Sequence, residues 1–280
     1  MAKNAQARAG TERRTPARLR AHYEIERELA DRLRGSSRVE RSTLYGLVYD
    51  ELFRRVPDHP QHTRKADLAF QRQAVASRLR LLELHVTRES VFMEIGPGDC
   101  SLALEIAGRA RHVYAVDVSA EIIKGLSIPA NLDLVICSGA GFTIPPATVD
   151  VAYSNQVLEH LHPDDAIDHI RSVRSALKPG GLYVCVTPNR LSGPHDISQY
   201  FDSVATGLHL KEYTARELID IFTREGYRNV SVLVTAGRRR FSVNSGVIRM
   251  LEPCLAGIPR SIRRSRFFES LLGITILARR

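Results

Sequence analysis

The stretch VFMEIGPGDCSLALEIA, residues 91–107, places an acid and two glycines between two apolar segments. Residues 91–95 have the composition of a buried strand, and the apolar side chains of 101–107 recur at helical spacing. Gly96 and Gly98 therefore predict a tight turn from strand to helix. Such a turn directs backbone N–H groups and the positive end of a helix at a ligand. We expect a ligand to bind here.

The spacing of these glycines discriminates between nucleotide ligands. The dinucleotide fingerprint has glycine at its first, third and sixth positions, whereas GPGDCS has Ser101 at the sixth. Glu94 precedes the turn, and its carboxylate would repel a pyrophosphate but attract a cationic amino acid group. The turn therefore favours S-adenosylmethionine (SAM), with S-adenosylhomocysteine (SAH) as product, over NAD.

Polar residues also follow two later hydrophobic segments. Asp117 ends HVYAVD, about 20 residues beyond the glycines, where a carboxylate can accept hydrogen bonds from both hydroxyls of a ribose. Asn155 and Gln156 follow VDVAYS, at the carboxyl end of a predicted strand. Open parallel sheets bind ligands at that edge. Both segments should contribute to the same site as the glycine turn.

Two histidines are candidates for proton transfer. His160 in VLEHL lies just beyond the same sheet edge, and His209 lies in GLHLKEYT. A sulfonium is already an activated methyl donor, but a hydroxyl or acidic carbon acceptor must lose a proton, which an imidazole with a pKa near 6.5 can accept. Capping or orienting the next helix is the alternative role for His160. His195 and Tyr213, in or beside the long segment 190–210, are further candidates that the sequence does not rank.

The elements that must position these residues alternate in type. Helical patterns at 101–107, 120–126, 164–177 and 215–225 separate seven predicted strands. The strands are 91–95, 112–117, 132–138, 149–154, 181–187, 229–235 and 271–278. This order predicts an α/β fold: a Rossmann-like, doubly wound, mostly parallel seven-stranded sheet with an antiparallel closing strand.

The flanks of this core differ from it in composition. Residues 1–15 are predicted to form a disordered basic tail, and 16–88 an N-terminal helical extension with helices at about 16–34, 40–56 and 62–86. Residues 89–280 form the predicted SAM-binding domain, with a basic helical insert at about 238–270 before the last strand. The extension either covers a pocket or only packs on the core.

Composition limits the cellular setting. The net charge of +9 arises from basic ends that flank an acidic core, so the protein has no general basic coat. The four cysteines form no CxxC pair or metal-binding spacing, which is typical of a reducing compartment. Because neither a signal peptide nor a long apolar segment is apparent, we expect a cytoplasmic protein.

Five segments together carry a family resemblance: MEIGPGDC, VYAVDVS, SGAGFTIP, VDVAYSNQVLEHL and LKPGGLYVCVTPN. In this order and spacing, over about residues 85–236, the chain resembles the class I SAM-dependent methyltransferases. It is most similar to the group that acts on small molecules (methyltransferase type 11), which includes ubiquinone-type O-methyltransferases. The resemblance implies a SAM-dependent methyltransferase that acts on an oxygen, or less favourably a carbon, of a small-molecule acceptor.

The resemblance also implies roles for individual residues. Glu94, Gly96 and Gly98 would lie beside the methionine part of SAM, and Asp117 with Val118 would hold the ribose. Family members often have an aspartate after the third strand where this chain has Gly139, so the backbone of Ala140 and Gly141 would contact adenine. Cys100 replaces a third glycine. Asn155 and Gln156 would complete the cofactor site. We expect no metal site.

Two other functions remain alternatives. The run QVLEH is similar to the E-x-x-E-H metal site of small-RNA 2′-O-methyltransferases, and the basic ends could bind phosphates. Gln156 replaces the first glutamate of that run, which weakens a metal site, so nucleic acid is a disfavoured partner. The other alternative is a non-catalytic SAM-binding module. Its basic insert, which includes Arg260 and Arg263, would contact a partner or an anionic membrane. The sequence does not determine the oligomeric state.

Overall fold

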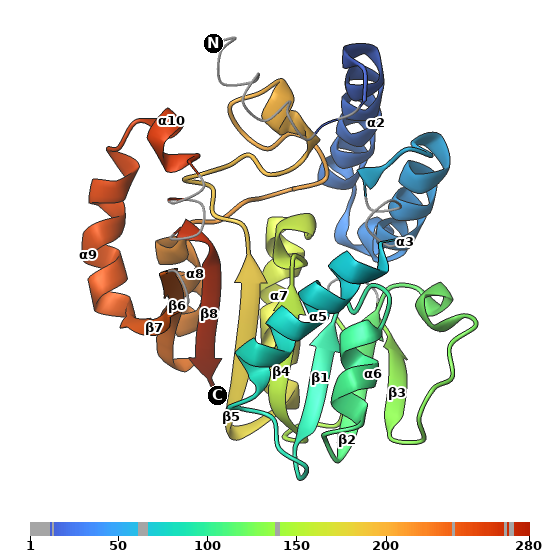
Figure 1. Cartoon of the computed structure of the whole chain (residues 1–280), viewed down its shortest axis with the longest axis vertical. Coiled ribbons are helices and arrows are strands. Elements are labelled where there is room, and N and C mark those ends of the chain that lie inside the picture. The colour runs from blue at the N-terminus through green and yellow to red at the C-terminus, as the bar shows by residue number, and fades with distance from the viewer. Residues whose placement is uncertain are drawn as a thin grey trace.

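The structure, a computed structural model, describes residues 12, 14–60, 67–137, 141–236, 239–265, 268 and 272–280. A central sheet carries helices on both faces, and two helices of the N-terminal region lie over one of its edges (Figure 1).

The sheet has eight strands in the described part of the chain, in the order β3-β2-β1-β4-β5-β8-β6-β7. The strands β1 to β5 are parallel to one another, and β8 is antiparallel to both of its neighbours, β5 and β6. The bounds are β1 Val91–Ile95, β2 His112–Asp117, β3 Leu132–Ile136, β4 Val149–Asn155, β5 Leu177–Thr187, β6 Arg228–Ala236, β7 Arg239–Asn244 and β8 Ile274–Arg279. The predicted doubly wound sheet with an antiparallel closing strand is confirmed.

The described helices separate these strands or precede them. The α-helices are α2 Pro16–Gly35, α3 Arg38–Arg55, α5 Leu68–Leu82, α6 Ser101–Ala107, α7 Pro163–Ala176, α8 Ala215–Arg224, α9 Ser245–Ala256 and α10 Arg260–Arg263. Single 3₁₀ turns lie at η1 Ala120–Ile123, η2 Leu158–His160 and η3 Ile197–Tyr200. Ser37 and Thr214 form capping boxes with Glu40 and Glu217, which explains where α3 and α8 begin.

Apolar side chains fill both faces of the sheet. One buried cluster includes Met93, Tyr183 and Phe222 and extends to the N-terminal helices through Leu29 and Val48. The other includes Phe92, Leu102 and Val184, beneath α5 and α6, with Leu82 of α5 fully buried. Since strand side chains alternate between faces, the apolar residues of β1 and β5 supply both clusters.

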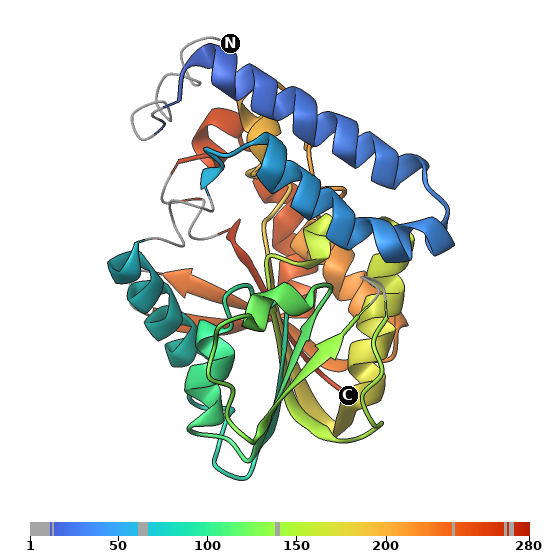
Figure 2. The same cartoon turned by 90° about the vertical axis from the view of Figure 1, so that its right-hand side faces the viewer.

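Helices α2 and α3 cross the edge of the sheet where the parallel strands have their carboxyl ends (Figure 2). Tyr23 of α2 donates a hydrogen bond to Asp202, at 2.7 Å, and Arg34 donates to the carbonyl oxygens of Thr206 and Gly207, both at 3.2 Å. These contacts join the N-terminal helices to the segment that follows β5. The edge at which a ligand was expected is therefore covered.

Three elements differ from the sequence prediction. The insert contributes an eighth strand, because Arg239–Asn244 pairs antiparallel with β6. Residues 120–126, predicted as a helix, form only the 3₁₀ turn η1 before Gly125, whose φ of +77° favours glycine. Helix α5 spans Leu68–Leu82, and the beginning of the predicted helix 62–86 lies outside the described residues. The proposed domain boundaries stay a prediction.

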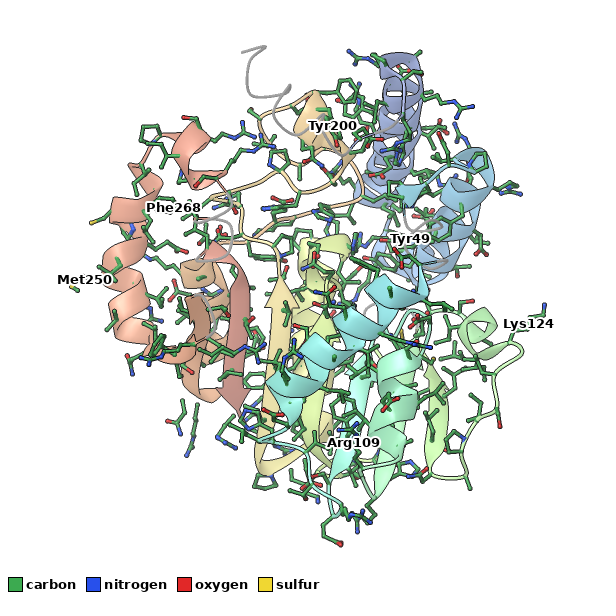
Figure 3. All side chains as sticks on the ribbon, in the orientation of Figure 1. Tyr49, Arg109, Lys124, Tyr200, Met250 and Phe268 are labelled. Carbon is green, nitrogen blue, oxygen red and sulfur yellow. The ribbon has the colours of Figure 1, made fainter. Side chains whose placement is uncertain are left out.

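The insert exposes apolar side chains. Met250 of α9 is 67% exposed and points away from the body of the molecule in Figure 3. Val247, Leu251 and Ile262 are also exposed. Among the described helices, none combines the length and apolar character that a membrane crossing requires. Peripheral membrane contact through this insert stays a prediction.

Candidate functional site

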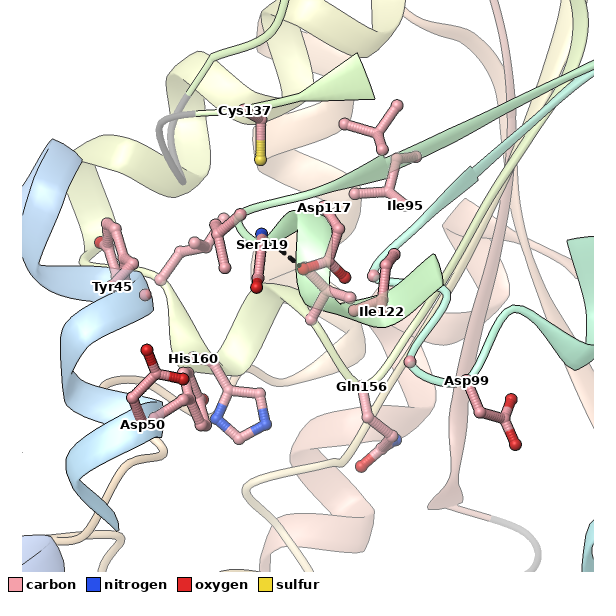
Figure 4. A pocket seen from close by; sticks show the side chains of 18 of the residues that line it. Tyr45, Asp50, Ile95, Asp99, Asp117, Ser119, Ile122, Cys137, Gln156 and His160 are labelled. Atoms are coloured by element: carbon pink, nitrogen blue, oxygen red, sulfur yellow. Dashed lines mark hydrogen bonds between the residues drawn. The ribbon is translucent and has the colours of Figure 1, made fainter. Parts of the chain in front are cut away.

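A cavity of about 560 Å³ lies beneath α3, at the carboxyl ends of β1, β2 and β4. Its volume falls in the range typical of small-molecule sites. Figure 4 shows side chains from α3, from the strand ends and from the segment after β4 around one space. The predicted site residues that line it are Gly96, Gly98, Asp117, Val118, Gln156 and His160. Six of the predicted positions therefore meet in one cavity.

The glycine turn has the backbone that its sequence predicts. Gly96 and Gly98 both have φ of +65°, and a Cβ atom on Gly96 would lie 2.6 Å from Cγ2 of Val157. Cys100 also adopts the left-handed conformation, with φ of 59°, which is strained for a residue other than glycine. This turn keeps side chains away from the cavity wall, so a ligand can approach the backbone at Gly96 and Gly98.

Glu94 lies behind this turn and is not among the residues that line the cavity. Its side chain is 3% exposed, and its Oε2 has no hydrogen-bond partner among the described residues. Burial raises the pKa of Glu94 to about 8. Alternation along β1 turns Ile95 toward the cavity and Glu94 away from it. That Glu94 contacts the methionine part of SAM stays a prediction.

Asp117 ends β2 on the cavity wall. Its Oδ1 accepts a hydrogen bond from the backbone N–H of Ser119 at 3.1 Å, which fixes the carboxylate at the strand end. Val118, Ser119 and Ile122 continue the wall from Asp117. The position and the fixed orientation of this carboxylate suit the acceptance of hydrogen bonds from a ribose.

The ends of β3 and β4 differ in what they contribute. Cys137 lines the cavity, a role that the sequence did not indicate, whereas Gly139 and Ala140 lie outside the described residues. Gln156 lines the cavity with φ of 57°, and its N–H donates to the carbonyl of Val186. Asn155, the last residue of β4, is not among the lining residues. The cofactor roles of Gly139, Ala140 and Asn155 stay predictions.

His160 projects into the cavity from η2 (Figure 4). Its Nδ1 lies 3.0 Å from the carbonyl oxygen of Leu208, which can only accept, so Nδ1 carries the proton and Nε2 is unprotonated. Burial, together with the nearby charge of His209, lowers the pKa of His160 to about 3. His160 is therefore neutral at physiological pH and a weak proton acceptor.

His209 packs directly behind His160, although it does not line the cavity. The two rings meet edge to face, with centroids 4.8 Å apart. His209 is 7% exposed, and its Nδ1 lies 2.7 Å from Oε1 of Glu212. Burial alone would lower the pKa of His209, but the hydrogen bond to Glu212 and the charge of Glu159 raise it to about 9.

Two glutamates organise these histidines: Glu159, which belongs to the QVLEH run, and Glu212, which the sequence did not single out. Glu159 is fully buried, its Oε2 accepts a hydrogen bond from Thr187 at 2.9 Å, and burial raises its pKa to about 7. Glu212 contacts both His209 and His195. His195 lines a second, adjoining pocket rather than this cavity. Tyr213 is buried in the core. Glu212 follows His209 by three residues, but only folding brings Glu159 to this pair, because residue 159 lies far from both in the sequence.

Helix α3 supplies one wall of the cavity with Tyr45, Tyr49, Asp50 and Phe53. Figure 3 shows Tyr49 between α3 and the upper edge of the sheet. The ring of Tyr49 meets His160 edge to face at 5.9 Å. The extension thus both packs on the core and covers the cavity, the two roles that the sequence left open.

The chain was compared with known proteins. The family model described as "Methyltransferase domain" matches residues 62–232, more than half of the chain. The chain belongs to this methyltransferase family. Within it, the chain is a member of the class I SAM-dependent methyltransferases, and its cofactor is SAM. The resemblance that the sequence motifs indicated is confirmed.

Two curated relatives of this methyltransferase come from mycobacteria. A probable SAM-dependent methyltransferase of Mycolicibacterium smegmatis is 29% identical over 136 residues, which cover 48% of this chain and 51% of the relative. One from Mycobacterium tuberculosis is 30% identical over 141 residues, which cover 50% and 49% of the two chains. The chain thus spans about half the length of the curated relatives it matches.

Solved structures share the fold of this methyltransferase at low identity. A SAM-dependent methyltransferase of Archaeoglobus fulgidus is 20% identical, with a TM-score of 0.51 over 75% of this chain and 94% of that chain. A phosphoethanolamine N-methyltransferase of Haemonchus contortus, bound to phosphomonomethylethanolamine and SAH, is 14% identical. Its TM-score is 0.50, over 73% of this chain and 52% of that chain. These similarities establish the class I fold.

Proposed function

We propose that this methyltransferase transfers the methyl group of SAM to an oxygen atom of a small molecule with an apolar body. The observation that carries the proposal is the single cavity that joins the glycine turn and Asp117 to His160 and to aromatic side chains of α3. The glycine turn and Asp117 suit the cofactor, and Tyr49 and Phe53 suit an apolar acceptor.

Methyl transfer depends mainly on in-line placement of the acceptor atom, since the sulfonium is already activated. His160 is the side chain best placed for this purpose, because its unprotonated Nε2 can accept a hydrogen bond from an acceptor hydroxyl. Its low pKa favours an orienting role. The sequence predicted that His160 or His209 takes up the proton of the acceptor. For that role, the bound acceptor must change the surroundings of the histidine and with them its pKa.

Oxygen is the favoured methyl acceptor for a reason in the sequence. Enzymes that methylate the amino groups of nucleic acid bases or glutamine resemble one another in an Asn/Asp-Pro-Pro-aromatic signature after the fourth strand. This chain has Ser154-Asn155-Gln156-Val157 there. Carbon is less favoured. Small amines belong in the test because one protein of the same fold is described as a phosphoethanolamine N-methyltransferase in complex with phosphomonomethylethanolamine.

The first test is titration calorimetry with SAH. We expect micromolar binding by the unaltered chain and a loss of at least tenfold in Asp117→Asn, since the amide is a weaker acceptor for the ribose hydroxyls. Asp133→Asn is the matched control, because Asp133 also lies on a strand but outside the cavity. Failure of the folded chain to bind SAH would refute the proposal.

The second test concerns the acceptor. The chain is incubated with methyl-labelled SAM and a panel of phenols, aliphatic alcohols, carboxylic acids and small amines. Label on an oxygen acceptor, reduced in His160→Gln with SAH affinity retained, supports the proposal. Label on amines alone would contradict the choice of oxygen. SAH binding without transfer to any acceptor would favour the non-catalytic module.

A further inference from the structure

Three side chains that can bind a metal ion meet beside the cavity: Glu159, His160 and His209. Each offers one ligand atom, and these atoms lie within 4.8 Å of one another. His160 and His209 also stack edge to face. Two imidazoles and one carboxylate are a ligand set that suits Zn²⁺ and related divalent transition metals.

Hydrogen bonds hold all three side chains in orientations that suit metal binding. Nδ1 of His160 donates to the carbonyl of Leu208, and Nδ1 of His209 lies 2.7 Å from the carboxylate of Glu212. Metal-binding histidines typically donate one ring N–H to a carbonyl or a carboxylate in this way, which leaves the other nitrogen for the metal. Both histidines therefore have Nε2 as the nitrogen available to an ion.

Glu159 supplies the observation that points to a ligand. Its side chain is fully buried, and Thr187 hydrogen-bonds only to Oε2, at 2.9 Å. Oε1 is buried and has no hydrogen-bond partner among the described residues. A buried carboxylate oxygen without a partner is unfavourable unless something binds it.

A second cluster in the chain shows what a purely structural arrangement looks like. His22, Glu26 and His59 also bring their ligand atoms within 4.8 Å of one another. However, Arg14 lies 2.7 Å from Nδ1 of His22 and can only donate, while Nε2 of His22 lies 2.8 Å from Glu26. Both nitrogens of His22 are thus engaged within the protein, so His22 has no ring nitrogen to offer an ion.

We propose that Glu159, His160 and His209 bind one divalent transition-metal ion, with Zn²⁺ as the best match, at the wall of the cavity. Binding would draw the three ligand atoms closer together, since zinc bonds to nitrogen and oxygen are roughly 2.0 Å long. His160 lines the cavity, so the remaining coordination position faces it. The site differs from the metal-free one that the sequence predicted.

The use of that open position rests on the proposed function. An acceptor with an oxygen donor would bind there as the fourth ligand, and the ion would lower the pKa of an acceptor hydroxyl. His160 would then act as a metal ligand, which excludes its role as hydrogen-bond partner of the acceptor. A proton on Nε2 of His209, shared with Glu159, is the alternative occupant of this space.

Metal titration of the full chain decides between these occupants. The chain is freed of metal with a chelator, and ZnCl₂, MnCl₂ or MgCl₂ is added in a calorimeter. We expect one high-affinity Zn²⁺ per chain, with weaker Mn²⁺ binding and no measurable Mg²⁺ binding. His160→Gln and His209→Gln should each weaken Zn²⁺ binding at least tenfold, and Glu212→Gln should weaken it 10-fold to 100-fold through the orientation of His209. His59→Gln is the matched control and should not change it.

The outcomes separate the two proposals. Absence of tight Zn²⁺ binding by the unaltered chain, or tight binding that persists in both His160→Gln and His209→Gln, overturns the metal site. SAH affinity is measured on the same samples: SAH binding without Zn²⁺ binding refutes only the metal site, and Zn²⁺ binding without SAH binding refutes only the proposed function. If a histidine variant fails to fold, visible absorption of Co²⁺ added to the unaltered chain and to Glu159→Gln tests the same ligand set.

Discussion

Arg41 of α3 donates two hydrogen bonds to the carboxylate of Asp165 in the first turn of α7, at 2.6 and 2.8 Å. Both side chains are almost completely buried, at 5% and 1% exposure. Tyr45 also donates to Asp165, at 2.6 Å. The pair fixes α3, and with it one wall of the cavity, to the methyltransferase core.

Loss of Arg41 should destabilise the protein strongly. In Arg41→Met, Asp165 stays buried without its countercharge, which costs about 3–5 kcal/mol of unfolding free energy. Asp165→Asn in the same chain should recover part of that loss, because it removes the unpaired charge. Urea unfolding measures both. Arg249→Met, in the exposed pair of Arg249 with Asp220, is the control and should cost less than about 1 kcal/mol. Equal losses at the two sites would contradict the role of Arg41.

Alanine should be tolerated less well at Gly96 than at Gly98. Both positions have positive φ, but a Cβ on Gly96 would clash with Cγ2 of Val157, whereas a Cβ on Gly98 meets no atom within 4 Å. We expect Gly98→Ala to cost about 1–2 kcal/mol from backbone strain and Gly96→Ala to cost more and to weaken SAH binding. In a chain that already carries Val157→Ala, the loss of unfolding free energy caused by Gly96→Ala should decrease toward that caused by Gly98→Ala. If the effects of Gly96→Ala and Val157→Ala simply add, the clash with Val157 is not the cause of the loss at Gly96.

Acid should destabilise the N-terminal helices. Burial would raise the pKa of Glu26, but hydrogen bonds from His22 and His59 hold it far below its ordinary value, and burial lowers the pKa of His59. The unfolded chain therefore binds protons more readily at both sites, so stability is full at neutral pH. It should fall below about pH 6.5 as His59 is protonated in the unfolded chain, and further below about pH 4.3 through Glu26.

The measurement is urea unfolding between pH 7.5 and pH 3.5. Glu26→Gln keeps an oxygen that accepts from His22 but does not titrate, so its stability should depend less steeply on pH below about pH 4.3. Glu24→Gln, on the exposed side of α2, is the matched control. A Glu26→Gln profile that runs parallel to that of the unaltered chain would rule out this carboxylate as the source. Arg14 faces the same cluster and keeps its charge throughout.

Glu94→Gln should stabilise the ligand-free protein at alkaline pH. Because burial raises the pKa of Glu94 to about 8, the folded chain holds a proton that the unfolded chain loses near pH 4.3. The stability from this group is therefore full below about pH 4.3 and decreases as pH rises to 8. We expect unfolding free energies of the variant above those of the unaltered chain at pH 8. SAH affinity in the variant then tests the predicted contact with methionine: a loss supports it, and unchanged affinity removes it.

Much of the fold was predictable because local patterns agree with the final contacts. The short apolar runs of β1 and β4, the glycines at 96 and 98, and the capping pair Thr214 and Glu217 each depend on residues close in the sequence. The same locality explains why Asp117 was found, since it ends a strand at a fixed distance from the turn. Residues 239–244 were missed as a strand because only Phe241 and Val243 of the edge strand RRFSVN are apolar, which gives too short an apolar pattern to indicate a strand.

The amino-acid sequence by itself determined the α/β sheet, the glycine turn between β1 and α6 and the methyltransferase family, because these depend on short segments with characteristic spacing. Tertiary structure decided which residues share the site. It buried Glu94 behind the turn, placed α3 over the cavity through Arg41 and Asp165, and brought His160, His209, Glu159 and Glu212 together. These contacts join segments that are far apart in the chain, so packing and burial, rather than local pattern, determine them.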